Sequence, residues 1–381
     1  MGGGRDHRHR IDVPLGLAQV RALRLRSSPS RPTIGRMSAA APTPANQGGQ
    51  GVAVSRWPSL TLTRRIFAVG VWTQIAIVFT GGLVRLTDSG LGCPTWPQCV
   101  PGSYTPVRYQ SQSFHKYIEF GNRTLTVVVV AVVLASLLAA WRMTPRRTPL
   151  VLLALGGVAG VFAQAVLGGV SVLTHLNPYV VAGHFLLSMA LVAVALALYE
   201  RSRDAGDGPP VPLVRQEVRW LSAALVLVGS VVLVLGTLVT GSGPHSGDGQ
   251  RVARTGLDPS QIAWMHADVV MLFVGLVVAM LIALRLTSAP GPARQRAWIL
   301  FGVTMAQGAI GYLQYFTGVP WMLVSLHVLG ATLLWVSVLR LIYPLRARGS
   351  GGPNDQPMVG ASDRPSTSTT AAANLSGAAG S

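Results

Sequence analysis

Charged residues are scarce in this chain of 381 residues: they make up 12% of it, whereas hydrophobic residues make up 50%. Together with a positive mean hydropathy, this excludes an ordinary soluble globular domain and indicates an integral membrane protein. Acidic residues are scarcer than basic ones: the chain has 13 Asp and Glu against 31 Lys and Arg, which gives a formal net charge of +18. The basic residues lie in the termini and in alternate connecting segments rather than on one soluble stretch, so we expect no nucleic-acid partner.

Long apolar runs are abundant. A helix of about 20 residues crosses a hydrocarbon core of roughly 30 Å, and runs of that length occur eight times. We therefore predict an all-α integral membrane protein with eight transmembrane helices, over residues 66–86, 118–140, 149–173, 180–200, 220–240, 262–286, 296–316 and 321–344.

The arginines indicate the orientation of these helices. They lie before the first, between the second and third, fourth and fifth, and sixth and seventh, and after the eighth. The positive-inside rule then places both termini in the cytoplasm of a multi-pass protein of the cell membrane. The segment after the first helix, with Cys93 and Cys99, faces outward.

Both ends of the chain lack a sustained apolar period. Residues 1–62 are rich in Arg, Pro, Gly, Ser and Ala and predict a disordered basic tail. They lack the apolar region that a signal peptide needs, and Met37 offers a later start. Residues 348–381 are a low-complexity run of Gly, Ser, Thr and Ala and predict a second disordered tail.

Between the tails the sequence repeats. Two predicted helix pairs share a glutamine that precedes a histidine by 20 residues: Gln164 with His184, and Gln307 with His327. In the same way YIEFGNR aligns with QIAWMHA, which sets Asn122 against His266. We therefore predict two parallel four-helix repeats, an N-terminal half over 63–202 and a C-terminal half over 203–347.

Three histidines lie inside the predicted spans, each one to two turns below the outer end of an even-numbered helix: His184, His266 and His327. Ionisable residues within a span are costly and mark function by default. Imidazoles from facing helices can hold a haem iron, and an apolar slot between helices suits a flat porphyrin. Zinc would need further ligands at short reach, so the pattern favours haem. Histidines satisfied by neighbouring helices are the alternative.

One carboxylate is predicted at a depth in the membrane similar to that of the three histidines. Glu119 lies three residues before Asn122 on one helix face, where it suits proton transfer or stabilisation of developing positive charge. The alternative is a structural ion pair with Arg123 or Arg85. Both arginines also suit haem propionates, because a guanidinium matches carboxylate geometry.

The run TGGLVRLTDSGLGCPTWPQC at 80–99, the segment IEFGNR, the paired Gln–His helices and the eight-span layout resemble bacterial haem A synthase over roughly residues 64–345. The resemblance implies an enzyme that oxidises the C8 methyl group of haem O to the formyl group of haem A, for cytochrome oxidase assembly. It implies a haem b held by His266 and His327 in the C-terminal half. Pathway logic alone suggests haem O synthase, the protohaem farnesyltransferase, as a partner, and the sequence does not name the electron donor.

In the N-terminal half the resemblance implies a substrate-haem site formed by His184, Asn122, Arg123 and Arg85, with Glu119 as the catalytic residue. The family more commonly has histidine at the position of Asn122, in an E-x-x-H-R motif. Because an amide is a poor iron ligand, we expect His184 alone to bind the substrate iron while Asn122 donates or accepts a hydrogen bond. His115, on the same face but about 10 Å higher, is an alternative ligand.

Two other classes stay open. A bis-histidine haem b electron-transfer protein usually stacks two haems at two depths, whereas one depth dominates here. A tetrapyrrole transporter often has inverted repeats and helices broken near the midplane, whereas these repeats are parallel. Both comparisons favour the synthase.

Cys93 and Cys99 are the only cysteines, with five residues between them, on the side where disulfides persist. Two interpretations stay open: a structural disulfide that holds the first outer loop, and a redox-active pair above the substrate site. The resemblance supports the second, because many family members have such a pair in this loop. The matching loop of the C-terminal half has no cysteine.

Overall fold

The computed structural model describes residues 58–249 and 253–349. Met37 and nearly all of the two predicted tails lie outside the described residues, so the expected disorder stays a prediction.

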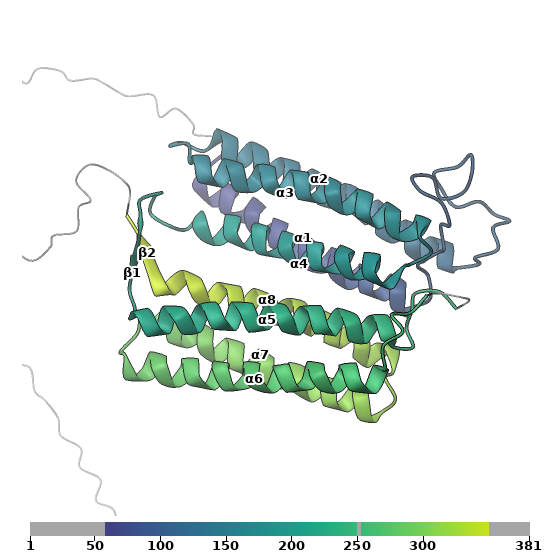
Figure 1. The fold of residues 1–381 in the computed structure, drawn as a ribbon. Coiled ribbons are helices and arrows are strands. Elements are labelled where there is room, and N and C mark those ends of the chain that lie inside the picture. The colour runs from purple at the N-terminus through teal and green to yellow at the C-terminus, as the bar shows by residue number, and fades with distance from the viewer. Residues whose placement is uncertain (1–57, 250–252, 350–381) are drawn as a thin grey trace, which may run out of the picture. The chain divides into compact units, whose positions relative to one another are not determined.

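Eight long helices make up most of the described residues (Figure 1). Each begins and ends near a predicted span, because an apolar segment in a bilayer must satisfy its backbone groups internally, and a helix does so. The first helix begins ahead of the predicted boundary at 63, since the Ser59 side chain accepts from the Leu62 amide at 3.2 Å and caps it. The helices are α1 (Leu60–Leu86), α2 (His115–Arg142), α3 (Thr148–Leu173), α4 (Pro178–Arg201), α5 (Gln216–Ser242), α6 (Pro259–Leu286), α7 (Gly291–Phe316) and α8 (Trp321–Ile342).

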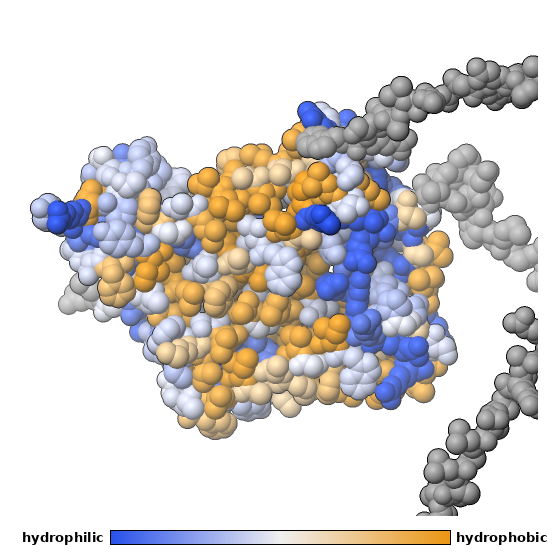
Figure 2. Space-filling view, turned by 180° about the vertical axis from the view of Figure 1, so that it is seen from behind, coloured by the Kyte–Doolittle hydropathy of each residue, from blue (hydrophilic) through white to orange (hydrophobic). Residues whose placement is uncertain are grey.

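Seven of these helices are long and apolar enough to cross a membrane, which makes the chain a multi-pass membrane protein. Helix α7 is not among the seven: Arg294 and Arg296 lie near its start, and Gln307 and Gln314 interrupt its apolar part. Figure 2 shows hydrophobic side chains in a broad band across one face, with hydrophilic ones gathered towards the ends.

Helices α1–α4 lie together, and α5–α8 lie together (Figure 1). Helices α1 and α4 contact α8, and α4 also contacts α5. At this junction the Trp335 indole on α8 donates to the carbonyl of Met189 on α4 at 3.1 Å. Buried apolar side chains from both groups form one cluster there: Val78, Met189, Val192, Leu233 and Trp335.

A small sheet departs from the all-α prediction. Strand β1 (Pro210–Pro212) pairs antiparallel with β2 (Arg346–Arg348), just after the short 3-10 helix Tyr343–Leu345. The pairing joins the α4–α5 connection to the segment that follows α8. Three-residue strands are too short to leave a periodic pattern in the sequence, so sequence reasoning missed them.

At the same end of the bundle, a buried carboxylate links the two groups of helices. Glu200 on α4 is 4% exposed and accepts from Arg296 of α7 at 3.1 Å and from Arg340 of α8 at 2.9 Å. Removal of one partner of a buried ion pair leaves the other partner uncompensated, at a cost of about 3–5 kcal/mol. The sequence did not single out Glu200, because no local residue pattern distinguishes it from other acidic residues.

We expect Glu200→Ala to lower the free energy of unfolding by about 3 kcal/mol, the lower end of that range, because Arg340 is partly exposed. Thermal unfolding of the detergent-solubilised protein measures it. Glu217→Ala is the matched control, since its pair with Arg215 is exposed on both sides and should contribute under about 1 kcal/mol. Equal effects of the two substitutions would contradict the role of Glu200.

Candidate functional site

A cavity of about 320 Å³ lies among α1–α4, near the lower end of the roughly 300–1,000 Å³ typical of ligand pockets. We call the end of the bundle that holds Cys93 and Cys99 the disulfide end, and the cavity extends towards it, since Trp96 from between the two cysteines is part of its lining. Most of its lining is apolar. Its ionisable and amide side chains include Arg85, Glu119, Asn122, Arg123, Gln164 and His184.

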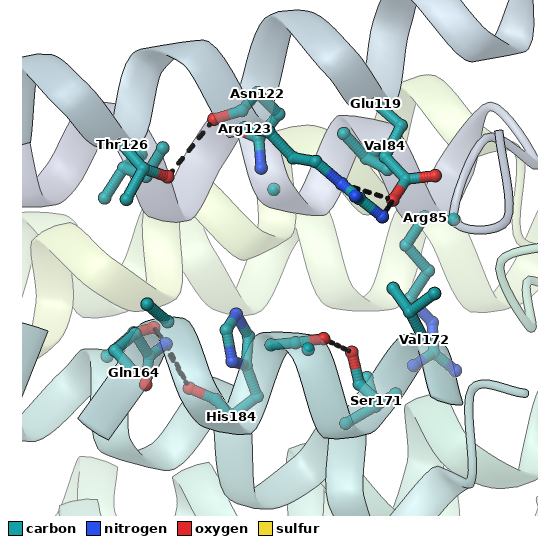
Figure 3. Close-up of a pocket in the computed structure, with 18 of the residues that line it drawn as sticks. Val84, Arg85, Glu119, Asn122, Arg123, Thr126, Gln164, Ser171, Val172 and His184 are labelled. Atoms are coloured by element: carbon teal, nitrogen blue, oxygen red, sulfur yellow. Dashed lines mark hydrogen bonds and ion pairs between the residues drawn. The ribbon is translucent and has the colours of Figure 1, made fainter. Parts of the chain in front are cut away.

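Asn122 and His184 face the cavity from opposite sides, on α2 and α4 (Figure 3). The Thr80 hydroxyl on α1 donates to Asn122 Oδ1 at 2.8 Å, whereas the buried His184 Nδ1 has no hydrogen-bond partner. His115, the first residue of α2, is not part of the lining. Its Nδ1 lies 3.0 Å from Ser89 Oγ. Helix α2 therefore contributes Asn122 to the cavity, not His115.

A glycine of the preceding helix lies against Asn122 and against each of the three helix histidines. We call Gly81, Gly168, Gly236 and Gly311 the facing glycines. Measured from where a Cβ would stand, the nearest atoms are Asn122 Nδ2 at 3.9 Å from Gly81, His184 Cε1 at 3.0 Å from Gly168, His266 Cε1 at 3.4 Å from Gly236, and His327 Cε1 at 3.2 Å from Gly311. At Gly168 and Gly311 an added Cβ would crowd the imidazole, whereas at Gly236 the distance of 3.4 Å is close to ordinary contact. Glycine at the first two positions therefore leaves room for the ring.

Two of these histidines accept a hydrogen bond from a glutamine at their backbone carbonyl. Gln164 Nε2 donates to the His184 carbonyl at 2.8 Å, and Gln307 Nε2 donates to the His327 carbonyl at 2.8 Å. The spacing of 20 residues in the sequence therefore corresponds to a contact between adjacent helices. Each contact fixes the backbone from which an imidazole projects.

The Nδ1 atoms of His266 and His327 are buried without a hydrogen-bond partner. Within residues 58–249 and 253–349, no three His, Cys, Asp or Glu side chains come close enough to share one metal ion. The three helix histidines therefore do not converge on a single ion.

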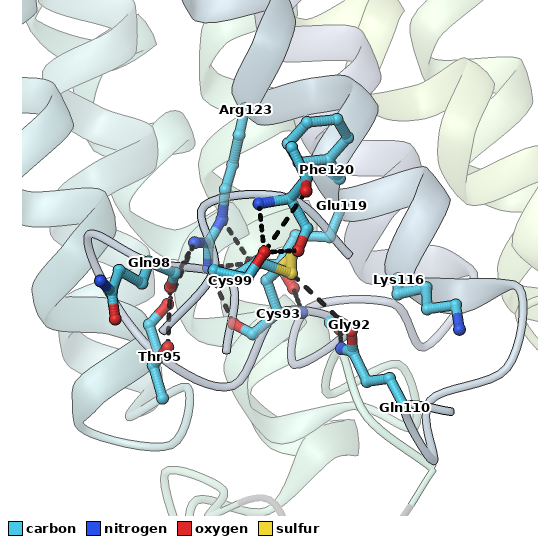
Figure 4. Close-up of a disulfide and its surroundings, with 12 residues drawn as sticks. Gly92, Cys93, Thr95, Gln98, Cys99, Gln110, Lys116, Glu119, Phe120 and Arg123 are labelled. Carbon is cyan, nitrogen blue, oxygen red and sulfur yellow. Dashed lines mark hydrogen bonds and ion pairs between the residues drawn. A yellow bond between two sulfur atoms is a disulfide. The ribbon is translucent and has the colours of Figure 1, made fainter. Parts of the chain in front are cut away.

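Glu119 lies at the disulfide end of the cavity, 5% exposed, in a dense set of contacts (Figure 4). Its Oε2 accepts from the Cys93 amide at 2.7 Å, and its Oε1 accepts from Arg123 Nη2 at 2.5 Å. Arg123 also donates to the carbonyls of Cys93 at 2.8 Å and Thr95 at 3.0 Å. The ion pair that the sequence left open is therefore present, with Arg123 and not with Arg85.

Cys93 and Cys99 form a disulfide, and the loop that contains it covers part of the cavity. Trp96, between the two cysteines, lines the cavity and lies so close to Gly169 of α3 that a Cβ there would not fit. No residue pattern in the sequence indicated the contact between Trp96 and α3.

A second loop, after α5, also reaches the disulfide end. Arg85 Nε donates to the His245 carbonyl at 2.8 Å and Nη2 to the Thr240 carbonyl at 3.0 Å. Nearby, the Gly90 amide donates to the Gly247 carbonyl at 2.8 Å, and Gly247 itself lines the cavity. Sequence reasoning missed Gly247 and Thr80, although the predicted repeat could have indicated that the matching loops LTDSG and VTGSG lie at one end.

Residues 64–245 match the COX15-CtaA family, described as cytochrome oxidase assembly protein. The chain is 29% identical over 161 residues to the haem A synthase of Geobacillus kaustophilus, covering 39% of this chain and 49% of that relative. It is 29% identical over 274 residues to the haem A synthase of Symbiobacterium thermophilum, covering 67% of this chain and 88% of the relative. It is 28% identical over 332 residues to that of a Caulobacter species, covering 74% and 95%.

The chain spans about half the length of the Geobacillus relative, 49%, and most of the other two. The family match includes α1–α4, the disulfide loop, the pair Glu119–Arg123 and nearly the whole lining of the cavity. Residues 64–245 of this chain are therefore similar to the COX15-CtaA family of cytochrome oxidase assembly proteins.

Proposed function

We propose that this protein is a haem A synthase, a membrane oxidoreductase that converts the C8 methyl group of haem O to the formyl group of haem A. The observation that carries the proposal is the cavity, which brings His184, Asn122 and Glu119 together beneath the disulfide loop. The relatives named haem A synthase support the same activity.

The donor set fits haem in both halves. His266 and His327 would hold a haem b axially in the C-terminal half, and His184 would bind the iron of the substrate haem. Each has a buried, unpartnered Nδ1 and a glycine opposite its ring, and imidazole is a common axial ligand. Bound in this way, the haem b would supply electron transfer.

The chemistry requires a group that handles protons and positive charge. As a half-reaction with water, conversion of a methyl to a formyl group releases four electrons and four protons. Glu119 is the catalytic residue that we propose for this, since it lines the cavity and the Cys93 amide holds its carboxylate in place. General acid–base groups act at such positions.

Arg85 and Arg123 would meet the propionates of the substrate haem, because both line the cavity at its disulfide end and a guanidinium suits a carboxylate. Haem O synthase is the partner that we propose, since it makes the substrate. The four electrons released by the half-reaction require a separate oxidant: either an external electron acceptor, or molecular oxygen, in which case a separate electron donor is required as well.

The two halves would be parallel copies of a four-helix unit, with α7 as the eighth span and both termini cytoplasmic. Matched positions support the repeat: His184 and His327 are the seventh residues of α4 and α8, and Asn122 and His266 are the eighth residues of α2 and α6. The facing glycines and the two glutamine contacts recur in the same way.

Pigment extraction tests the function. The full chain, coexpressed with haem O synthase in a host that makes no haem A, should yield haem A together with haem B. Haem B alone would support the electron-transfer protein instead. Bound tetrapyrrole without any haem A would support the transporter.

We expect Gly168→Ala to lower haem A formation by less than about 10²-fold, because that factor belongs to a misplacement of roughly 1 Å and the His184 ring has to give way by only a few tenths of an ångström. The new Cβ would lie 3.0 Å from His184 Cε1 and displace the ring, while the haem b spectrum should be retained. Gly156→Ala, on the same helix with open space around it, is the matched control. Normal haem A yield from Gly168→Ala would contradict this role of the glycine.

A further inference from the structure

We propose that a haem bound in the N-terminal half is ligated by the protein on one face only, through His184, and that the face towards Asn122 is open to a small uncharged ligand such as a diatomic gas. This rests on the proposed function, because it requires a haem in the cavity among α1–α4.

The first support is the internal comparison of the four positions that the proposed repeat matches. Each of Asn122, His184, His266 and His327 lies against a facing glycine at nearly the same depth in its helix. Three of these positions have an imidazole and one has an amide. The same geometry therefore provides two axial ligands in the C-terminal half and one in the N-terminal half.

The second support is the rest of the lining. Haem iron in proteins is commonly held by His, Cys, Met or Tyr. Among the residues that line this cavity, within the described part of the chain, His184 is the single member of that set. The one carboxylate, Glu119, already accepts from Arg123 and from the Cys93 amide.

The third support is the way in which Asn122 is held. The Thr80 hydroxyl donates to its Oδ1 at 2.8 Å, so Nδ2 is the amide end left for a ligand in the cavity. A hydrogen-bond donor beside an open iron face is one of the features by which a distal pocket decides between gas binding and electron transfer. Asn122 would thus contact the exogenous ligand rather than the iron.

The test uses the full-length protein loaded with haem O, reduced and exposed to carbon monoxide. We expect a carbon monoxide adduct on the N-terminal haem and none on the six-coordinate haem of the C-terminal half. Asn122→His should abolish the adduct and convert the N-terminal haem to a low-spin spectrum. The unchanged C-terminal haem spectrum shows that the variant has folded.

Asn122→Leu tests the amide contact separately. This variant should still bind carbon monoxide, with a shifted C–O stretching frequency; an unshifted frequency would overturn the contact. A low-spin N-terminal haem that refuses carbon monoxide in the unmodified protein would overturn the open face but leave the proposed function intact. Absence of any haem from the N-terminal half, shown by haem content per chain, would overturn both.

Discussion

Glu119→Gln is expected to lower haem A formation by about 10²–10⁴-fold, the usual contribution of a positioned acid–base group, while haem O is still bound. The amide keeps an oxygen that can accept from the Cys93 N–H, so the disulfide loop should stay in place. It loses the negative charge that the carboxylate offers to Arg123 and to positive charge developing on the substrate. Haem O and haem A extracted from the purified variant give the ratio directly.

Two comparisons separate chemistry from structure at this position. Glu119→Ala removes the acceptor for the Cys93 amide as well and should also destabilise the loop, which thermal unfolding detects. Glu217→Gln changes a highly exposed carboxylate on α5 and should leave haem A formation unchanged. If Glu119→Gln formed haem A at the normal rate, Glu119 would have a purely structural role.

The second large effect concerns the C-terminal half. We expect His266→Ala and His327→Ala each to lose the low-spin haem b spectrum, because a six-coordinate iron needs both axial imidazoles. Optical and paramagnetic-resonance spectra of the purified variants measure the loss. Added imidazole should restore the low-spin spectrum, since the space left by the ring can admit it.

His175→Ala is the control, because that histidine is exposed in the connection between α3 and α4. It should keep the haem b spectrum in full. An unchanged spectrum in either His266→Ala or His327→Ala would remove that residue from the ligand set and point to a different pair of axial groups.

The positions of the helices follow from the sequence because apolar length is a local property. Seven of the eight predicted spans lie wholly within helices, and the last extends into the 3-10 helix at Tyr343–Leu345. Helix α7 is not apolar enough to count among the membrane-crossing helices, because arginines and glutamines interrupt its apolar residues. The 20-residue glutamine–histidine spacing also corresponds to real contacts, since both residues lie on adjacent antiparallel helices joined by a short turn.

The closure of the site could not be predicted in the same way. The hydrogen bonds from Arg85 to the Thr240 and His245 carbonyls join segments about 155 and 160 residues apart. Their acceptors are backbone atoms, which no residue pattern marks. The contact between Thr80 and Asn122 likewise depends on how α1 and α2 pack, and it decides which end of the amide faces the cavity.

The link from Arg85 and Gly90 to the loop after α5 has a consequence for biosynthesis. Helices α1–α4 are made first, and at the disulfide end their cavity is then lined by the disulfide loop and by the α3–α4 connection, which includes Leu176. Ser246 and Gly247, which complete this lining, exist only after α5 has been synthesised. A gene cut before α5 would therefore yield a cavity that lacks these two lining residues.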